Sequence, residues 1–217
     1  NAPGLAIIDN FLAPESLHAL RRMLLSSTIW FDVKNGYLGA YFTAGLSTPI
    51  LTQIEEELRD RMPNVIGELP LITVWAYKCA STSPEGLAIH ADMAAVNINL
   101  WLTPTEANLD VRNVDVGKEG GGLLLYLTRD EDLPTNWNFK EMNYMDQTDK
   151  MYDFIKETQS QRVNVPYRQN RATVFHSRLF HESARFQFKE GYENSRINLT
   201  FLFGRPAIDR KLTEWVD

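Results

Sequence analysis

The chain has 217 residues, of which 44% are hydrophobic and 23% are charged, so it can bury a sizeable core and is not intrinsically disordered. Its formal net charge is −6, and no run of Lys or Arg forms the basic stripe that nucleic acid requires of a partner. The single cysteine, Cys79, excludes an intrachain disulfide and a zinc site of several thiolates, which fits a reducing, cytoplasmic location. No stretch approaches ~18 apolar residues, so we expect no membrane span.

The N-terminal part of the chain predicts one strand and two amphipathic helices. A short apolar strand is expected at residues 5–8. Residues 13–16, Ala-Pro-Glu-Ser, are typical of a helix start, and leucines come after them at helical spacing. A second helix is expected from residue 48 to about residue 61, with Pro49 in its first turn. Both helices are interpreted as an outer scaffold.

From Leu69 onward, β-branched and aromatic runs broken by turn residues predict a sheet-rich body. About eight strands are expected, a number that suits a double-sheet jelly roll. They lie near residues 72–78, 87–90, 95–102, 122–127, 162–165, 172–176, 181–188 and 195–203. The predicted fold is therefore mainly β, a double-stranded β-helix core with flanking N-terminal helices. We predict one domain over residues 1–217, with helical support at 1–68 and the jelly-roll core at 69–204.

A polar, aromatic-containing insertion is predicted at residues 128–161, and its last part, 146–158, has a helical pattern. Long insertions between core strands are more often functional than accidental. We therefore hypothesise that the insertion forms a lid over a substrate. Its aromatic residues are Trp137, Phe139, Tyr144 and Tyr152. Limited proteolysis that cuts this segment equally with and without substrate would count against the lid.

One of the four histidines opens the sequence His90-Ala91-Asp92. In an extended strand, residues i and i+2 project to the same face, so this imidazole and this carboxylate can converge on one ion. Together they suit a borderline-to-hard divalent metal, and a third ligand from elsewhere would complete a facial triad with open positions. An isolated His-x-Asp occurs by chance in many proteins, so a metal site requires support from residues later in the chain.

Two further histidines, His176 and His181, precede a strand in which Arg196, Asn198 and Thr200 alternate with apolar residues. A central strand normally points apolar residues inward, so a regular polar face requires either solvent, on an edge strand, or a buried polar guest. A guanidinium offers two parallel hydrogen bonds to a ligand carboxylate, which a lysine does less well. Together with the histidines, this pattern favours the buried guest.

The combined pattern resembles the 2-oxoglutarate and Fe(II)-dependent dioxygenases, particularly the prolyl-hydroxylase-like branch. In that branch a His-x-Asp is followed by a distal His and then by an Arg on the next strand. The resemblance covers residues 71–204. It implies that His90, Asp92 and His181 bind Fe(II). It also implies that Arg196 binds the distal carboxylate of the cosubstrate 2-oxoglutarate.

The third metal ligand has two competing histidines. His181 and Arg196 are 196 − 181 = 15 positions apart, more than the roughly ten that are common in the family, and the segment 188–193 is expected to absorb the excess. His176 lies still further from Arg196, and the ligating histidine of the family is usually followed by an acidic or polar residue, as in His181-Glu182. We therefore prefer His181 and interpret His176 as a hydrogen-bonded core residue or a residue behind the ligands.

Three further residues are predicted to line the cosubstrate pocket. Tyr77 resembles the tyrosine that hydrogen-bonds the cosubstrate in this branch, although ordinary core packing would equally explain a phenol on this strand. Asn99 shares one face of its strand with Asn97 and Trp101, and Thr200 shares one face with Arg196. Of these residues, Asn99 and Thr200 are the preferred lining residues.

The resemblance implies an enzyme that consumes 2-oxoglutarate and O2, releases succinate and CO2, and hydroxylates a C–H bond. Related halogenases replace the carboxylate with a small residue to admit chloride, so Asp92 favours hydroxylation. The substrate, a small molecule or a peptide or protein, is not specified by these residues. Two other classes stay open: a cupin-like metalloenzyme that does not use 2-oxoglutarate, and a non-catalytic jelly-roll binding module. A hydrolytic zinc site is disfavoured because no well-placed general base accompanies the ligands.

Overall fold

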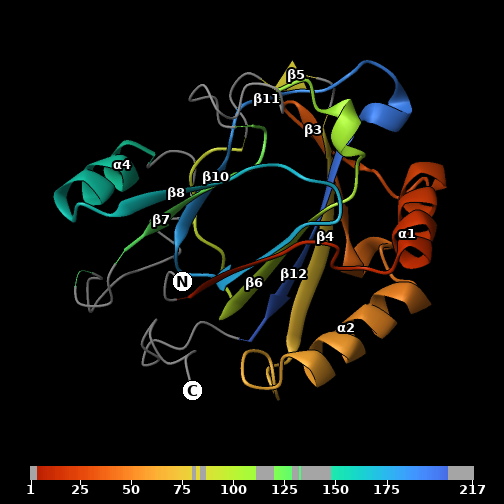
Figure 1. Cartoon of the computed structure of the whole chain (residues 1–217), viewed down its shortest axis with the longest axis horizontal. Helices are drawn as coiled ribbons and strands as arrows, with labels where there is room; N and C mark the ends of the chain where they lie inside the picture. The colour runs from red at the N-terminus through yellow and green to blue at the C-terminus, as the bar shows by residue number, and fades with distance from the viewer. Residues whose placement is uncertain are drawn as a thin grey trace.

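The computed structural model describes residues 4–79, 82–83, 87–110, 120–128, 132 and 148–204. Its main element is a seven-stranded antiparallel sheet with the order β1-β9-β6-β12-β4-β3-β2 (Figure 1). The strands are β1 (Leu5–Ile8), β2 (Asp32–Lys34), β3 (Tyr37–Tyr41), β4 (Leu71–Cys79), β6 (Val96–Trp101), β9 (Ala172–His176) and β12 (Arg196–Phe203). Because β12 pairs with β4 on one side and β6 on the other, it is a central strand of this sheet.

Two smaller antiparallel sheets complete the β structure. One has the order β10-β7-β8 and the other is a two-stranded pair, β11 with β5. Their bounds are β10 (Phe180–Ser183), β7 (Leu123–Leu127), β8 (Gln161–Val165), β11 (Phe186–Gln187) and β5 (Thr82–Ser83). In Figure 1 the three-stranded sheet lies on one side of the large sheet, while helices α1 and α2 lie on the other. The described structure is therefore mainly β, as the sequence predicts, and its strands pair antiparallel.

Two amphipathic helices, α1 (Pro14–Ser26) and α2 (Pro49–Arg61), pack against the outer face of the large sheet. A further helix, α4 (Thr148–Glu157), lies beside the small sheet (Figure 1). The short 3-10 turns are η1 (Phe42–Ala44), η2 (Thr105–Ala107) and η6 (Tyr192–Asn194). Leu20 and Leu24 of α1 join the same buried cluster as the alternate residues Leu199 and Phe201 of β12. The remaining residues of β12 consequently face the space between the two sheets.

That inner space has its own apolar core. Trp101 of β6, Leu125 of β7 and Phe175 of β9 belong to one buried cluster that joins the two sheets. Since every residue of β6, β9 and β12 is buried, these strands are covered on both faces. Any polar side chain on their inner faces is therefore buried too and requires a partner.

The predicted strand at residues 87–90 is wrong. In the described part of this segment only His90 forms a bridge, with His181, and the chain then turns away toward β9. The predicted strand at 181–188 divides into β10 and β11, because the chain changes partner from β7 to β5 between Ser183 and Phe186. The hairpin of β2 and β3 is an addition to the sequence prediction.

Within the described ranges, no helix has both the length and the apolar character needed to cross a membrane. The longest helices, α1 and α2, have 13 residues each, whereas a spanning helix needs about 20 apolar residues.

Candidate metal centre

Three side chains that the sequence singles out, His90, Asp92 and His181, lie together between the two sheets. One ligand atom from each can be chosen so that all three lie within 4.8 Å of one another. His90 Nε2 is 3.9 Å from Asp92 Oδ1, and His181 Nε2 is 3.4 Å from Asp92 Oδ2. The two imidazole rings have centroids 4.3 Å apart. Two imidazoles and one carboxylate thus face a common point.

Backbone pairing between distant segments creates this convergence. His90 and His181 lie directly opposite each other and exchange both backbone hydrogen bonds, at 2.9 and 2.8 Å. The N–H of Asp92 donates to Ser177 O at 3.0 Å, in the turn after β9. The prediction that His90 and Asp92 converge because they alternate along one strand is therefore wrong, since Asp92 lies beyond the bridge and is held by a different element.

Each histidine is oriented by a hydrogen bond at its other ring nitrogen. His90 Nδ1 lies 2.7 Å from Ala88 O, and His181 Nδ1 lies 2.9 Å from Leu179 O. A carbonyl oxygen only accepts, so both Nδ1 atoms carry a hydrogen, and the Nε2 atoms, which lie on the side of Asp92, are the ring nitrogens left to bind a metal. This arrangement is the one that metal-binding histidines adopt.

The electrostatics of the three groups agree with metal binding. Burial, together with the neighbouring His181, lowers the pKa of His90 below its usual value. Burial by itself would raise the pKa of Asp92, but hydrogen bonding and charge interaction with His181 lower it overall. At neutral pH the site therefore contains an ionised carboxylate beside a neutral His90 imidazole, the forms that ligate metals.

A cavity of about 200 Å³ adjoins the three side chains and extends to Arg196. Arg196 is the first residue of β12 and is only 2% exposed. Its position on a central strand excludes the alternative in which the polar face of residues 196–200 is the solvated face of an edge strand. Tyr77, Asn99 and Thr200, the three predicted lining residues, all line the same cavity.

Arg196 is a buried cation without a charged partner in the described structure. Its Nε donates to Gly121 O at 3.2 Å and its Nη1 donates to Asn198 Oδ1 at 3.4 Å. The rings of Phe186 and Tyr167 lie 4.9 and 5.9 Å from the guanidinium carbon. No carboxylate within the described ranges pairs with it. Because a buried charge without a counter-charge is strongly unfavourable, the site fits an anionic ligand.

Tyr77 lies beside the phenol of Tyr41 on the neighbouring strand. Burial raises the pKa of Tyr77 strongly, and a hydrogen bond to Tyr41 adds to the effect. Tyr41 in turn donates to Asp32 Oδ2 at 2.5 Å. Tyr77 is thus a neutral phenol at the cavity wall; since its hydrogen is directed to Tyr41, its oxygen is available to accept a hydrogen bond from a ligand.

Two asparagines adjoin the predicted binding residues: Asn198 lines the cavity, whereas Asn97 contacts Asp92. Asn198 lines the cavity between Arg196 and Thr200, and its place in the alternating strand would have identified it. Asn97 is fully buried and donates to Asp92 Oδ2. The sequence showed only that Asn97 shares a face with Asn99, because the hydrogen bond to Asp92 depends on the turn at residues 93–95.

His176, the competing histidine, is the last residue of β9 and is 3% exposed, but it is not one of the converging side chains. The backbone N–H of Arg178 donates to its Nδ1 at 3.3 Å. Burial lowers the pKa of His176 to about 4, with a further contribution from the charge of Arg178. These contacts agree with the interpretation of His176 as a hydrogen-bonded core residue.

We expect the depressed pKa of His176 to make folding pH-dependent. Because the unfolded chain protonates at about pH 6.5 and the folded chain only near pH 4, the unfolded state binds more protons between these values. The free energy of unfolding should fall as the pH drops through this window, by on the order of 3 kcal/mol from this residue. Urea unfolding at several pH values would measure it, and His176→Gln should reduce the slope. An unchanged slope in that variant would contradict the assignment.

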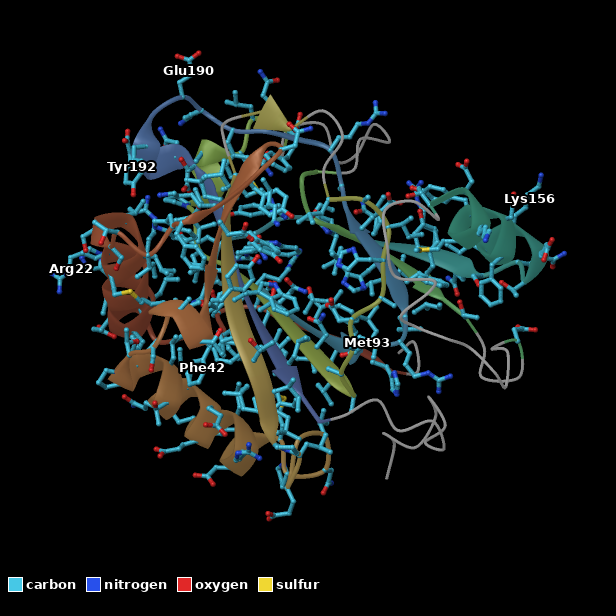
Figure 2. The ribbon with its side chains drawn as sticks, turned by 180° about the vertical axis from the view of Figure 1, so that it is seen from behind. Arg22, Phe42, Met93, Lys156, Glu190 and Tyr192 are labelled. Carbon is cyan, nitrogen blue, oxygen red and sulfur yellow. The ribbon has the colours of Figure 1, made fainter. Side chains whose placement is uncertain are left out.

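The extra length between His181 and Arg196 forms a segment that docks on α1. Tyr192 of η6 donates its hydroxyl to Leu25 O at 2.8 Å, and Arg21 Nη2 donates to Glu193 O at 2.5 Å. Lys78 Nζ donates to the Tyr192 hydroxyl at 2.8 Å and lies 4.5 Å from the ring of Trp30. Figure 2 shows Tyr192 and Glu190 at the outer end of this segment, near α1. The segment is thereby anchored directly before Arg196.

Residues 148–161 of the insertion pack behind the metal-binding segment. Met151 and Ile155 of α4 share a buried cluster with Ile89 and Ala91, the two neighbours of His90. Glu182, next to His181, accepts hydrogen bonds from Tyr126 at 2.5 Å and Tyr152 at 2.7 Å. Lys156 projects outward from α4 (Figure 2). Trp137, Phe139 and Tyr144, named in the lid hypothesis, lie outside the described residues.

Comparison with known proteins yields similar solved structures. One is the non-haem α-ketoglutarate-dependent epimerase SnoN from nogalamycin biosynthesis, solved in complex with Fe3+, α-ketoglutarate and nogalamycin RO. SnoN is 15% identical to this chain, with a TM-score of 0.62, and the match covers 94% of this chain and 80% of SnoN. This chain has the fold of the 2-oxoglutarate-dependent non-haem enzymes. HygX from Streptomyces hygroscopicus, solved with nickel and 2-oxoglutarate, is 12% identical with a TM-score of 0.61, covering 94% and 84% of the two chains. No family model and no curated protein sequence matches.

The carbocyclase SnoK from nogalamycin biosynthesis, also α-ketoglutarate-dependent, is 14% identical over 96% of this chain and 84% of its own, with a TM-score of 0.57. His90, Asp92 and His181 form a two-histidine, one-carboxylate set that is consistent with an Fe(II) site. Arg196 places a buried positive charge at the wall of the adjoining cavity.

Proposed function

We propose that this protein is a 2-oxoglutarate- and O2-dependent Fe(II) oxygenase of the prolyl-hydroxylase-like branch, built on a double-stranded β-helix. His90, Asp92 and His181 hold the iron, and Arg196 holds the distal carboxylate of 2-oxoglutarate. One observation carries the proposal: a single cavity is lined both by the three converging side chains and by a buried arginine that no described carboxylate neutralises. Tyr77, Asn99 and Thr200 line the same cavity and complete the cosubstrate site.

The residues of the chain perform distinct tasks. The iron, when bound, supplies the oxidation of a C–H bond by O2 while 2-oxoglutarate is converted to succinate and CO2. The Nδ1 hydrogen bonds of His90 and His181 hold both imidazoles in the tautomer that presents Nε2 to the metal. Arg196 orients the cosubstrate by a charge-assisted, two-point contact. The buried walls keep bulk water away from the reacting centre.

Hydroxylation is the outcome that the ligand set favours. Asp92 contributes a carboxylate where related halogenases have a small residue, so one coordination position is not open to chloride. SnoN and SnoK are an epimerase and a carbocyclase, so similar folds also serve other reactions. The substrate is a small molecule or a peptide or protein. A cytoplasmic location belongs to the same proposal, supported by the single cysteine, Cys79, which is buried and free.

The proposal is tested by adding Fe(II) and then 2-oxoglutarate to the purified protein without oxygen. Chelation of Fe(II) by 2-oxoglutarate produces a visible metal-to-ligand charge-transfer band, and the band should appear only when both are present. Admission of O2 should then yield succinate, which is measured by mass spectrometry. Metal binding without a band would favour the cupin-like metalloenzyme instead. Absence of any preference for Fe(II) over other divalent ions would favour a non-catalytic binding module.

A further inference from the structure

A continuous line of hydrogen bonds connects Arg196 with Asp92 through four uncharged side chains, which we call the polar row. The row consists of Asn198 and Thr200 from β12 and Asn99 and Asn97 from β6. Its five bonds run from Arg196 Nη1 to Asn198 Oδ1 (3.4 Å), Asn198 Nδ2 to Thr200 Oγ1 (3.5 Å), Thr200 Oγ1 to Asn99 Oδ1 (2.9 Å), Asn99 Nδ2 to Asn97 Oδ1 (2.9 Å), and Asn97 Nδ2 to Asp92 Oδ2.

The chemistry of the two ends dictates the direction of every bond in the polar row. A guanidinium has only donors and an ionised carboxylate has only acceptors. Each asparagine therefore points its carbonyl oxygen toward Arg196 and its amide nitrogen toward Asp92. Reversal of one amide would place two donors or two acceptors face to face, which a buried site penalises. The row thus has one satisfied arrangement while its ends keep their charges.

Strands β6 and β12 bury the polar row, so water does not compete for its hydrogen bonds. Thr200 and Asn99 are direct cross-strand partners, and Asn97 shares the same face of β6 with Asn99. All four side chains of the row are at most 8% exposed. Hydrogen bonds in such surroundings are stronger than in water, and unsatisfied groups are correspondingly unfavourable. A change at one member therefore affects the next.

We propose that the polar row positions Asp92 as an iron ligand, with Asn97 as the direct restraint and Thr200 acting through Asn99 and Asn97. This inference rests on the proposed function, because it takes Asp92 to be an iron ligand. The amide of Asn97 engages Oδ2 of Asp92 and thereby fixes the rotation of the carboxylate toward His90 and His181. The polar row thus connects the metal ligand Asp92 and the cosubstrate arginine Arg196 in one preorganised hydrogen-bond network.

The neighbouring strand provides a matched control. Thr173 of β9 is the other cross-strand partner of Asn99, is fully buried, and has a hydroxyl without a hydrogen-bond partner among the described residues. Thr200→Val and Thr173→Val are therefore the same isosteric change on the two strands that flank Asn99. Only Thr200→Val interrupts the polar row.

The experiment is an oxygen-free titration of the protein with Co(II), monitored by the visible absorption of the bound ion. Asn97→Leu should weaken Co(II) binding by about 10- to 100-fold, the effect typical of residues that support metal ligands. Thr200→Val should weaken it by on the order of threefold to tenfold and alter the intensity of the Co(II) bands. Thr173→Val should leave both readings as in the unmodified protein.

A double variant distinguishes positioning through the row from a general loss of packing. If Thr200 acts through Asn97, adding Thr200→Val to Asn97→Leu should cause little further loss of Co(II) affinity. Full additivity, or equal affinities in Thr200→Val and Thr173→Val, would overturn the inference. If Asn97→Leu does not fold, the comparison of Co(II) affinity between Thr200→Val and Thr173→Val is sufficient to test the inference. If the unmodified protein does not bind Co(II) at all, the proposed function fails; if it binds and the variants match it, only the positioning role fails.

Discussion

An Asp92→Ala variant should lose tight iron binding and all 2-oxoglutarate-dependent oxidation. Asp92 is the carboxylate among the three converging side chains, so its replacement by alanine leaves the set with two imidazoles and without its negative charge. Loss of residues that merely support metal ligands reduces metal affinity by about 10- to 100-fold, so loss of a ligand should exceed about 100-fold. Oxygen-free Fe(II) titration and the charge-transfer band would measure the effect.

The matched control is Glu182→Gln. Glu182 is adjacent to His181, but it accepts hydrogen bonds from Tyr126 and Tyr152 behind the site and does not converge with the three side chains. The Glu182→Gln variant should retain the charge-transfer band, and its affinity for Fe(II) should stay within a few-fold of that of the unmodified protein. Comparable losses in Glu182→Gln and Asp92→Ala would indicate that the carboxylate of Asp92 has no direct contact with the metal.

An Arg196→Met variant should keep its metal but bind 2-oxoglutarate at least about 100-fold more weakly. Truncating one partner of a buried, hydrogen-bonded charge pair raises the free energy of binding by about 2–5 kcal/mol. Methionine fills much of the space of arginine beside Phe186 without its charge, so the described core should remain packed. Titration of the charge-transfer band with 2-oxoglutarate gives the dissociation constant, and succinate formation gives KM.

Arg196→Lys serves as the companion to that variant. Lysine preserves the charge but not the planar fork, so its affinity for 2-oxoglutarate should lie between those of Arg196→Met and the unmodified protein. Full activity of Arg196→Met without addition of more 2-oxoglutarate would contradict the cosubstrate role. That result would favour a cupin-like metalloenzyme that uses the same three ligands.

Several parts of the fold were predictable because they depend on neighbours in the sequence. The strand at Leu5–Ile8 and helices α1 and α2 appear where apolar periodicity and the prolines at their first turns predict them. The alternation of Arg196 with apolar residues likewise predicted a strand with one polar face. Periodicity is a local property, so these assignments did not require any knowledge of long-range contacts.

The β2–β3 hairpin was missed although the sequence contains a signal for it. Lys34 pairs with Tyr37 across the two residues Asn35-Gly36, and Gly36 adopts a positive φ of 84°. An Asn-Gly pair between alternating residues is a strong hairpin signal. The wrong prediction of a strand at 87–90 has a different cause. The only backbone bridge that the described structure gives this segment joins His90 to His181, which belongs to a distant part of the chain, so local sequence does not reveal how short the pairing is.

Residue types and their spacing were enough to select the candidate site residues: a His-x-Asp, a distal histidine and an arginine on an alternating polar strand. That these side chains meet is a property of the folded chain alone. The bridge between His90 and His181, the anchoring of Asp92 by the turn after β9, and the central place of β12 all depend on pairing between distant segments. Residue type specifies what a group can bind, whereas convergence depends on backbone hydrogen bonds that no local pattern specifies.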